Sequence, residues 1–202
     1  MSKKILKLTI HRGTHEIGGT CVELATESTR ILIDIGLPLV DEDGQSFKLG
    51  NYFNLNKAEL VERKIAKDIL GLYREDKYNK PPDAILISHS HPDHYGLLPF
   101  VKPDIPLYLS EGCQELIKAT YYFRGLDSFL KTTEIVENQK SVSIGDFKIT
   151  PYLVDHSGFD AYAFLIEAEG KRVFYSGDFR GHGKKSSLFD RFIADPPEDI
   201  DY

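Results

Sequence analysis

Three histidines and one aspartate stand within six positions of the chain, at His89, His91, Asp93 and His94. They come directly after residues 83–88, a short apolar run typical of a buried strand. Histidines two positions apart cannot lie on one face of a helix, but a loop that wraps around an ion can direct both toward it. The spacing therefore predicts a metal-binding loop.

Two further ligand candidates also follow expected strands. His156 comes after a strand that ends at Val154, and Asp178 comes after the run Phe174-Tyr175-Ser176-Gly177. One ion would then have the three protein ligands typical of a catalytic zinc, with a position left for water: His89, His91 and His156. A second ion would be held by the remaining groups, the last of them bridging: Asp93, His94 and Asp178. We expect two divalent ions, with zinc favoured and manganese or iron compatible with the same ligands.

The pattern His89-x-His91-x-Asp93-His94, followed by His156 and Asp178, resembles the metallo-β-lactamase superfamily. That family's earliest acidic motif, at the end of an N-terminal strand, is matched by Asp34 in Ile33-Asp34-Ile35-Gly36. The resemblance implies that Asp34 hydrogen-bonds to the histidine loop and orients it without touching metal.

Two flanking segments narrow the resemblance to the β-CASP group, whose members include ribonuclease J and nucleases of mRNA 3′-end processing. These segments are Glu16–Cys21, preceded by Gly13, and Ser176-Gly177-Asp178-Phe179-Arg180. Lactamases and glyoxalases of the superfamily share the histidine loop but not these segments. The resemblance therefore favours phosphodiester chemistry.

In the β-CASP group a further domain follows the Gly-Asp-Phe motif, and a last histidine from the returning segment completes the second metal site. The 202 residues contain neither. We therefore expect one domain, residues 1–202, that forms the N-terminal portion of the family's catalytic unit. Either the sequence is a fragment of a longer protein, or a second polypeptide supplies the remainder. His182, four positions past Asp178, is a candidate substitute for the missing histidine.

The elements that must position these residues are read from apolar patterning and turn residues. Strands are expected at 5–11, 20–25, 30–35, 83–88, 107–109, 142–144, 147–154, 161–168 and 172–176, and helices at 56–73, 110–123 and 187–194. The first three strands form a meander, and residues 196–202 make an acidic turn that leads toward an absent strand. Sheets with covering helices follow from this order. The resemblance implies an αββα sandwich that lacks its C-terminal completion.

Composition excludes several classes of protein. With 41% hydrophobic residues the chain can bury a core, and 25 basic against 31 acidic residues give a net charge of −6. An acidic total argues against nonspecific coating of nucleic acid, which needs a broad basic surface. No apolar stretch approaches a membrane span, so we expect a cytoplasmic protein without a membrane partner. The two cysteines, Cys21 and Cys113, are expected to be small buried hydrophobes.

The leading hypothesis is a two-metal hydrolase that cleaves RNA phosphodiesters. The metals would lower the pKa of a bridging water, and the resulting hydroxide would attack phosphorus in line. Asp93 would orient this hydroxide or receive its proton, and His94 beside it is the other candidate catalytic residue. A basic run after Asp178 is expected to meet substrate phosphate: Arg180, His182, Lys184 and Lys185.

Two other functions stay open at this stage. The same fold could hydrolyse a thioester, lactone or small phosphodiester, since a carbonyl substrate uses the same nucleophile. The chain could also be an inactive half-domain that serves as an assembly surface, with a sheet edge open to pairing and oligomers possible.

Overall fold

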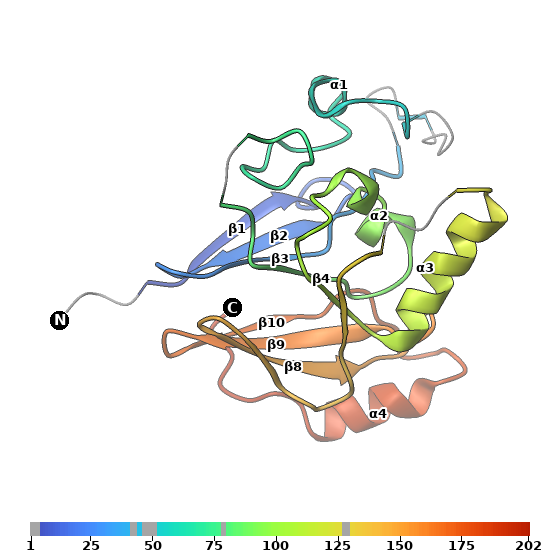
Figure 1. The fold of residues 1–202 in the computed structure, drawn as a ribbon. Coiled ribbons are helices and arrows are strands. Elements are labelled where there is room, and N and C mark those ends of the chain that lie inside the picture. The colour runs from blue at the N-terminus through green and yellow to red at the C-terminus, as the bar shows by residue number, and fades with distance from the viewer. Residues whose placement is uncertain (1–4, 41–43, 46–51, 78–79, 127–129) are drawn as a thin grey trace.

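A computed structural model describes residues 5–40, 44–45, 52–77, 80–126 and 130–202. Two β-sheets lie face to face in it, and helices lie on the outer side of each sheet (Figure 1). This is the αββα sandwich that was expected.

The N-terminal sheet has six strands in chain order. They are β1 (Lys7–Arg12), β2 (Cys21–Ala25), β3 (Arg30–Ile33), β4 (Ala84–Leu86), β5 (Leu107–Leu109) and β6 (Thr133–Ile135). Strands β1 to β3 are antiparallel, which confirms the meander, and β3 to β6 are parallel. Strand β6 was not predicted, because Thr-Glu-Ile is too short and too polar to show a buried run.

The C-terminal sheet has four antiparallel strands in the order β10-β9-β8-β7. They are β7 (Val142–Ile144), β8 (Phe147–Leu153), β9 (Tyr162–Ala168) and β10 (Lys171–Tyr175). The expected hairpin between β9 and β10 is present. Glu169 and Gly170 both have positive φ there, as tight hairpin turns require.

Alternation along the strands creates two apolar layers. On β4, Ala84 and Leu86 pack between the two sheets, while Ile85 faces the opposite side. Phe164 and Ile166 of β9 meet them from the other sheet. The second layer lies between the six-stranded sheet and its covering helices, where Leu60, Ile117 and Tyr121 are among the buried residues. The histidine loop therefore leaves a strand that is covered on both faces.

Five helical segments complete the sandwich. They are α1 (Lys57–Glu62), α2 (Pro92–Tyr95), the 3-10 turn Leu98–Phe100, α3 (Glu111–Phe123) and α4 (Ser186–Ala194). In Figure 1 α4 lies against the four-stranded sheet, on the side away from β1–β4. Its Phe192 stacks on Phe174 of β10 with ring centroids 5.5 Å apart. The helix predicted over residues 110–123 is present as α3, and the side chain of Ser110 caps it by accepting a hydrogen bond from Cys113 N–H.

The helix predicted over residues 56–73 was wrong in its length. Its capping box between Asn56 and Glu59 is present, but the helix ends at Glu62. Lys64 N–H bonds to Val61 C=O and Ile65 N–H bonds to Leu60 C=O, with Lys64 at φ 53°. This is a Schellman ending, which usually places glycine where Lys64 stands. The apolar side chains of Ile65, Ile69 and Leu72 are buried, although the chain there is irregular. Their spacing in the sequence is similar to that of a helix.

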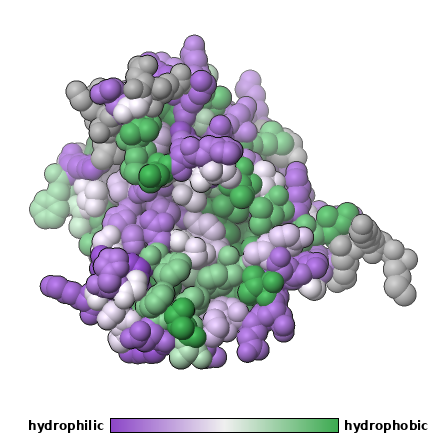
Figure 2. All heavy atoms as spheres, turned by 180° about the vertical axis from the view of Figure 1, so that it is seen from behind, coloured by the Kyte–Doolittle hydropathy of each residue, from purple (hydrophilic) through white to green (hydrophobic). Residues whose placement is uncertain are grey.

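The C-terminal residues lie beside strand β10. Asp201 N–H bonds to Arg172 C=O and Phe174 N–H bonds to Tyr202 C=O, so the last residues run along the outer edge of β10. On the face seen in Figure 2, hydrophilic side chains cover much of the surface and hydrophobic ones form separate patches. Among the described residues, no helix is both long and apolar enough to cross a membrane.

Candidate metal centre

The predicted ligands meet where strands of both sheets end. His89 and His91 lie in the loop that follows β4, and His94 lies in the short helix α2 directly after it. His156 follows β8, and Asp178 follows β10. The two sheets are joined directly at this point, because Tyr162 N–H donates to Ser88 C=O at 2.9 Å. Residues from distant parts of the sequence therefore face one small volume.

Three imidazole nitrogens converge in the first part of the centre. His91 Nδ1 lies 3.0 Å from His89 Nε2 and 3.1 Å from His156 Nε2. Nitrogens about 2.0–2.1 Å from one zinc ion in a tetrahedron would stand roughly 3.3 Å apart, so the trio has nearly this spacing. These three side chains could hold one divalent ion.

The proton positions on His89 support this fit. The Ser88 hydroxyl donates to Asp34 Oδ2 at 2.7 Å, so it accepts the proton of His89 Nδ1 at 3.0 Å. Burial, followed by repulsion from His94, lowers the pKa of His89 to about 3. A neutral His89 with its proton on Nδ1 presents a lone pair on Nε2 to the other two rings. Such a lone pair, directed at two other ring nitrogens, is available to coordinate a shared cation.

A second group overlaps the first. The ligand atoms of His89, His94 and Asp178 all lie within 4.8 Å of one another. His94 Nε2 is 3.7 Å from Asp178 Oδ2 and 3.7 Å from Asp93 Oδ2, and Asp178 Oδ2 is 3.9 Å from His156 Nε2. Asp178 thus stands between the two groups, as a bridging ligand would. Among the described residues Asp93 belongs to neither compact group, but its carboxylate borders the second.

Charge already compensates the carboxylates of this second group. Burial lowers the pKa of His94, yet Asp34, Asp178 and Asp93 outweigh burial and raise it to about 10. The ion pair with His94 lowers the pKa of Asp178 to about 2, against the opposing effect of burial. The raised pKa favours the protonated ring of His94, and a divalent ion bound there would displace its Nε2 proton.

Asp34 lies beneath both groups and is completely buried. It accepts hydrogen bonds from Ser88 N–H at 2.8 Å, from the Tyr175 hydroxyl at 2.5 Å and from His94 Nδ1 at 2.7 Å. Burial alone would raise the pKa of Asp34, but the charge and hydrogen bond of His94 keep it below the usual value. Bonding at Nδ1 leaves Nε2 of His94 directed at Asp93 and Asp178. These are hydrogen bonds that an orienting residue would make, and the orienting role of Asp34 stays a prediction.

Close backbone approaches fix the two ligand loops. A Cβ on Gly36 would lie 1.6 Å from the carbonyl oxygen of Asp93, so only glycine fits there. Thr20 N–H also bonds to this oxygen, at 3.2 Å, and joins the glycine-rich Glu16–Cys21 segment to the histidine loop. On the other side, Asp160 accepts from Gly112 N–H at 3.0 Å and ties the His156 loop to the start of α3. The flanking motifs are therefore supports of the centre.

The predicted basic run lies beside the centre. Arg180, His182, Lys184 and Lys185 line an open hollow of about 470 Å³, which His156 and Ser157 also line. His182 is exposed in this hollow, and among the described residues it joins neither group of converging ligand atoms.

Sequence reasoning missed several residues that support the centre. Ser88 and Tyr175 hydrogen-bond to Asp34, and Asp155 is a buried carboxylate beside the basic run. Ser88 stands at the end of an apolar strand, a position that signals its proximity to the site. Tyr175 carries no such signal, because a tyrosine in a strand is most simply read as core.

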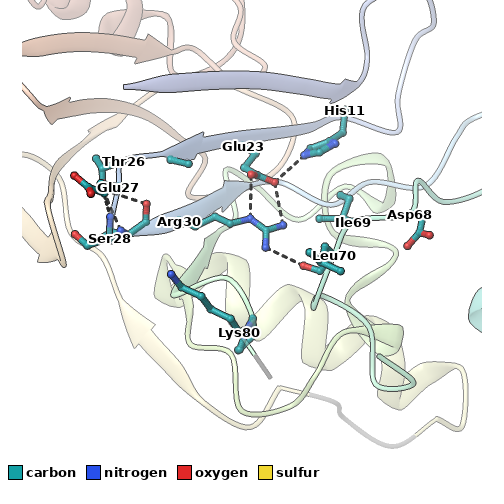
Figure 3. A pocket seen from close by; sticks show the side chains of 13 residues that line it. His11, Glu23, Thr26, Glu27, Ser28, Arg30, Asp68, Ile69, Leu70 and Lys80 are labelled. Atoms are coloured by element: carbon teal, nitrogen blue, oxygen red, sulfur yellow. Dashed lines mark hydrogen bonds and ion pairs between the residues drawn. The ribbon is translucent and has the colours of Figure 1, made fainter. Parts of the chain in front are cut away.

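A second hollow, of about 400 Å³, contains none of the predicted metal ligands (Figure 3). Glu23 on β2 accepts from His11 Nε2 at 2.9 Å and contacts Arg30 Nε at 2.9 Å, as the dashed lines show. Arg30 also donates to Leu70 C=O at 2.8 Å. Because these side chains bind one another, they link β1, β2 and β3 at this hollow, and we assign them a structural role.

Comparisons with known proteins agree with this geometry. The ribonuclease J of Helicobacter pylori strain 26695 is 27% identical over 183 residues, which cover 89% of this chain and 24% of that protein. An RNase J-like protein of Methanocaldococcus jannaschii is 23% identical over 181 residues, covering 85% of this chain and 36% of that one. The chain thus spans about a quarter to a third of the length of these relatives.

Solved structures and a family model identify the fold. A protein of unknown function from Enterococcus faecalis V583 superposes with a TM-score of 0.75 at 22% identity, over 95% of this chain and 47% of that one. The metallo-β-lactamase fold protein YhfI of Bacillus subtilis gives 0.52 at 16% identity, over 86% and 63%. The model of the β-lactamase superfamily domain matches residues 68–190. With its metallo-β-lactamase fold, the chain therefore belongs to the β-lactamase superfamily.

Proposed function

We propose that this chain carries the metal centre of a hydrolase that cleaves RNA phosphodiesters. The main support for this proposal is the convergence of three side chains, beside His94 and Asp178, at one end of the sandwich: His89, His91 and His156. Similarity to ribonuclease J over 89% of the chain supports RNA as the substrate class.

The donor set matches the chemistry of this proposal. The three imidazoles would hold one divalent ion, and Asp93, His94 and Asp178 would hold a second, with zinc favoured by the nitrogen-rich first group. When bound, the ions would lower the pKa of a water nucleophile and neutralise charge on the phosphate.

The protein's own residues would then guide the reaction. Asp93 is partly exposed, and its Oδ2 lies 3.7 Å from His94 Nε2, so it borders the space where substrate would enter. We assign Asp93 the role of orienting the attacking water and accepting its proton. Asp34 holds His94 in the matching orientation through their 2.7 Å hydrogen bond.

The test is cleavage of a labelled single-stranded RNA by the purified chain, with Zn²⁺ or Mn²⁺ added after removal of metals by a chelator. We expect cleavage that depends on added metal and falls at least about 100-fold in Asp93→Ala, the scale of a lost general base. Asp104→Asn, at an exposed aspartate outside the predicted ligand segments, is the matched control.

A thioester substrate is assayed in parallel, because a carbonyl compound can use the same nucleophile. Metal-dependent thioester hydrolysis without RNA cleavage would reject RNA as the substrate and leave a hydrolase of another class. Full metal-dependent RNA cleavage by Asp93→Ala would show that the assignment of Asp93 is wrong.

A further inference from the structure

We propose that the hollow beside His156 is a nucleotide subsite, in which basic side chains bind a phosphate of single-stranded RNA and Phe159 stacks on the neighbouring base. This inference rests on the proposed function. It identifies where the nucleotide next to the cleaved phosphodiester would bind.

The location of the hollow connects it to the metal centre. His156 and Ser157 line it, and Ser157 Oγ lies 3.5 Å from His91 Nε2. A phosphodiester that reacts at the histidines would therefore place an adjoining nucleotide in this hollow.

The charge of the hollow suits a phosphate. Arg180, Lys184 and Lys185 line it together with a single carboxylate, Asp155, whereas the whole chain has a net charge of −6. Positive side chains thus gather beside the centre of an acidic protein. Phosphate contacts from lysine and arginine supply much of the affinity of proteins for nucleic acids.

A buried contact holds Arg180 at this hollow. Asp155 is only 1% exposed; its C=O accepts from Arg180 N–H at 2.8 Å, and its Oδ1 lies 3.5 Å from Arg180 Nε. A Cβ on Gly183 would lie 2.2 Å from Asp155 Oδ2, so Gly183 packs directly over the pair. Arg180 is therefore pre-positioned, which lowers the entropy cost of binding a ligand.

This contact also has unused hydrogen-bonding capacity. Among the described residues, both carboxylate oxygens of Asp155 and the Nε of Arg180 have no hydrogen-bond partner. Buried polar groups in proteins are almost always satisfied. Gly183 covers these atoms, so a phosphate in the hollow would meet the part of the Arg180 side chain that stays exposed, which is 35% of it.

Phe159 supplies the aromatic surface of the subsite. Its side chain is 58% exposed, although the next residue, Asp160, fixes its backbone to the start of α3. A Cβ on Gly112 would lie 2.6 Å from the ring, so the first turn of α3 supports the ring. Lys185 Nζ lies 4.6 Å from the ring centroid. An anchored, exposed ring beside a lysine resembles the stacking platforms that bind single-stranded nucleic acids.

The test measures binding of a fluorescent single-stranded RNA by anisotropy, in chelator so that no cleavage occurs. We expect Phe159→Ala to raise the Kd about 5-fold or more, and Phe159→Tyr to restore most of the affinity. Lys184→Ala should raise the Kd and reduce the slope of log Kd against log salt by about 0.7. Phe123→Ala and Lys140→Ala remove an exposed phenylalanine and lysine elsewhere and should bind like the unmodified chain.

The outcomes distinguish a failure of the proposed subsite from a failure of the proposed function. If the unmodified chain binds and cleaves RNA while Phe159→Ala and Lys184→Ala bind like the controls, the subsite is wrong and the proposed function stands. If the unmodified chain neither binds nor cleaves RNA, both are wrong. Melting temperatures equal to that of the unmodified chain establish that each variant is folded.

Discussion

Single side chains decide whether the histidines can serve as ligands, because an imidazole coordinates through one nitrogen only. Asp34 binds the Nδ1 proton of His94, and Ser88 takes that of His89. In both rings Nε2 is left for coordination. A residue outside the predicted ligand set would thus determine which nitrogen each predicted ligand offers.

We expect Asp34→Asn to weaken metal binding by about 10- to 100-fold, the range seen when orienting partners of ligands are lost. The amide keeps the shape of the carboxylate, but its NH₂ group faces the donors Ser88 N–H or His94 Nδ1–H. Metal affinity is measured by competition with a chromogenic chelator. Asp104→Asn should match the unmodified chain, and an unchanged affinity in Asp34→Asn would show that Asp34 is not an orienting group.

At this scale the sequence predicts a residue best when neighbours in the chain are neighbours in space. His89 to His94 lie in one short segment, a loop followed by the first turn of α2, so their spacing alone indicated metal binding. Asp155 and Arg180 stand 25 positions apart and meet only because β8 and β10 end at the same edge. Nothing local distinguishes such a pair from two surface charges.

At the scale of elements, the link between β1, β2 and β3 gives a prediction about acid stability. The register of β1 on β2 shifts between Ile10 and Arg12, which leaves His11 at a bulge beside Glu23. Burial raises the pKa of Glu23, but hydrogen bonds from His11 and Arg30 outweigh it and lower the pKa to about 2. The folded state therefore favours the ionised carboxylate.

Because this pKa is depressed, the stabilisation is present above the usual value of 4.5 and is lost as the pH falls toward 2. Glu23→Gln should lower the free energy of unfolding by about 2 kcal/mol at neutral pH, allowing for partial solvent screening. The difference should vanish near pH 2. Urea unfolding of the chelated proteins measures it. Glu115→Gln, on an exposed part of α3, should cost little; a constant deficit for Glu23→Gln at every pH would contradict the assignment.

The elements themselves were predictable where a cap or an apolar run lies within one window. Ser110 and the run after it indicated α3, and the apolar strands of the second sheet were found. Residues 63–73 were assigned to a helix because their burial has a similar spacing, although Lys64 ends α1 in a conformation that glycine usually adopts. Tertiary packing, which no local pattern reports, made the difference.

At the scale of the whole molecule, the candidate ligands come from both sheets. His89, His91 and His94 follow β4 of the six-stranded sheet, while His156 and Asp178 follow strands of the four-stranded sheet. The layered order could be predicted from the succession of strands and helices. The meeting of the two sheets at Ser88 and Tyr162 could not, because that contact depends on how β4 and β9 face each other.

An ion shared by His89, His91 and His156 would therefore connect the two sheets and stabilise the fold as a whole. An ion that binds only the folded state, at about 100 times its Kd, contributes about 2.7 kcal/mol per site. For a chain of this size that corresponds to a rise of roughly 5–10 °C in the melting temperature. We expect this rise when Zn²⁺ is added to the chelated protein, and elemental mass spectrometry should find two equivalents bound.

His156→Ala should abolish most of the rise, since it leaves ligands of the first ion on one sheet only. His15→Ala, at an exposed histidine, should retain it. A full rise in His156→Ala would mean that His156 is not a ligand of the stabilising ion.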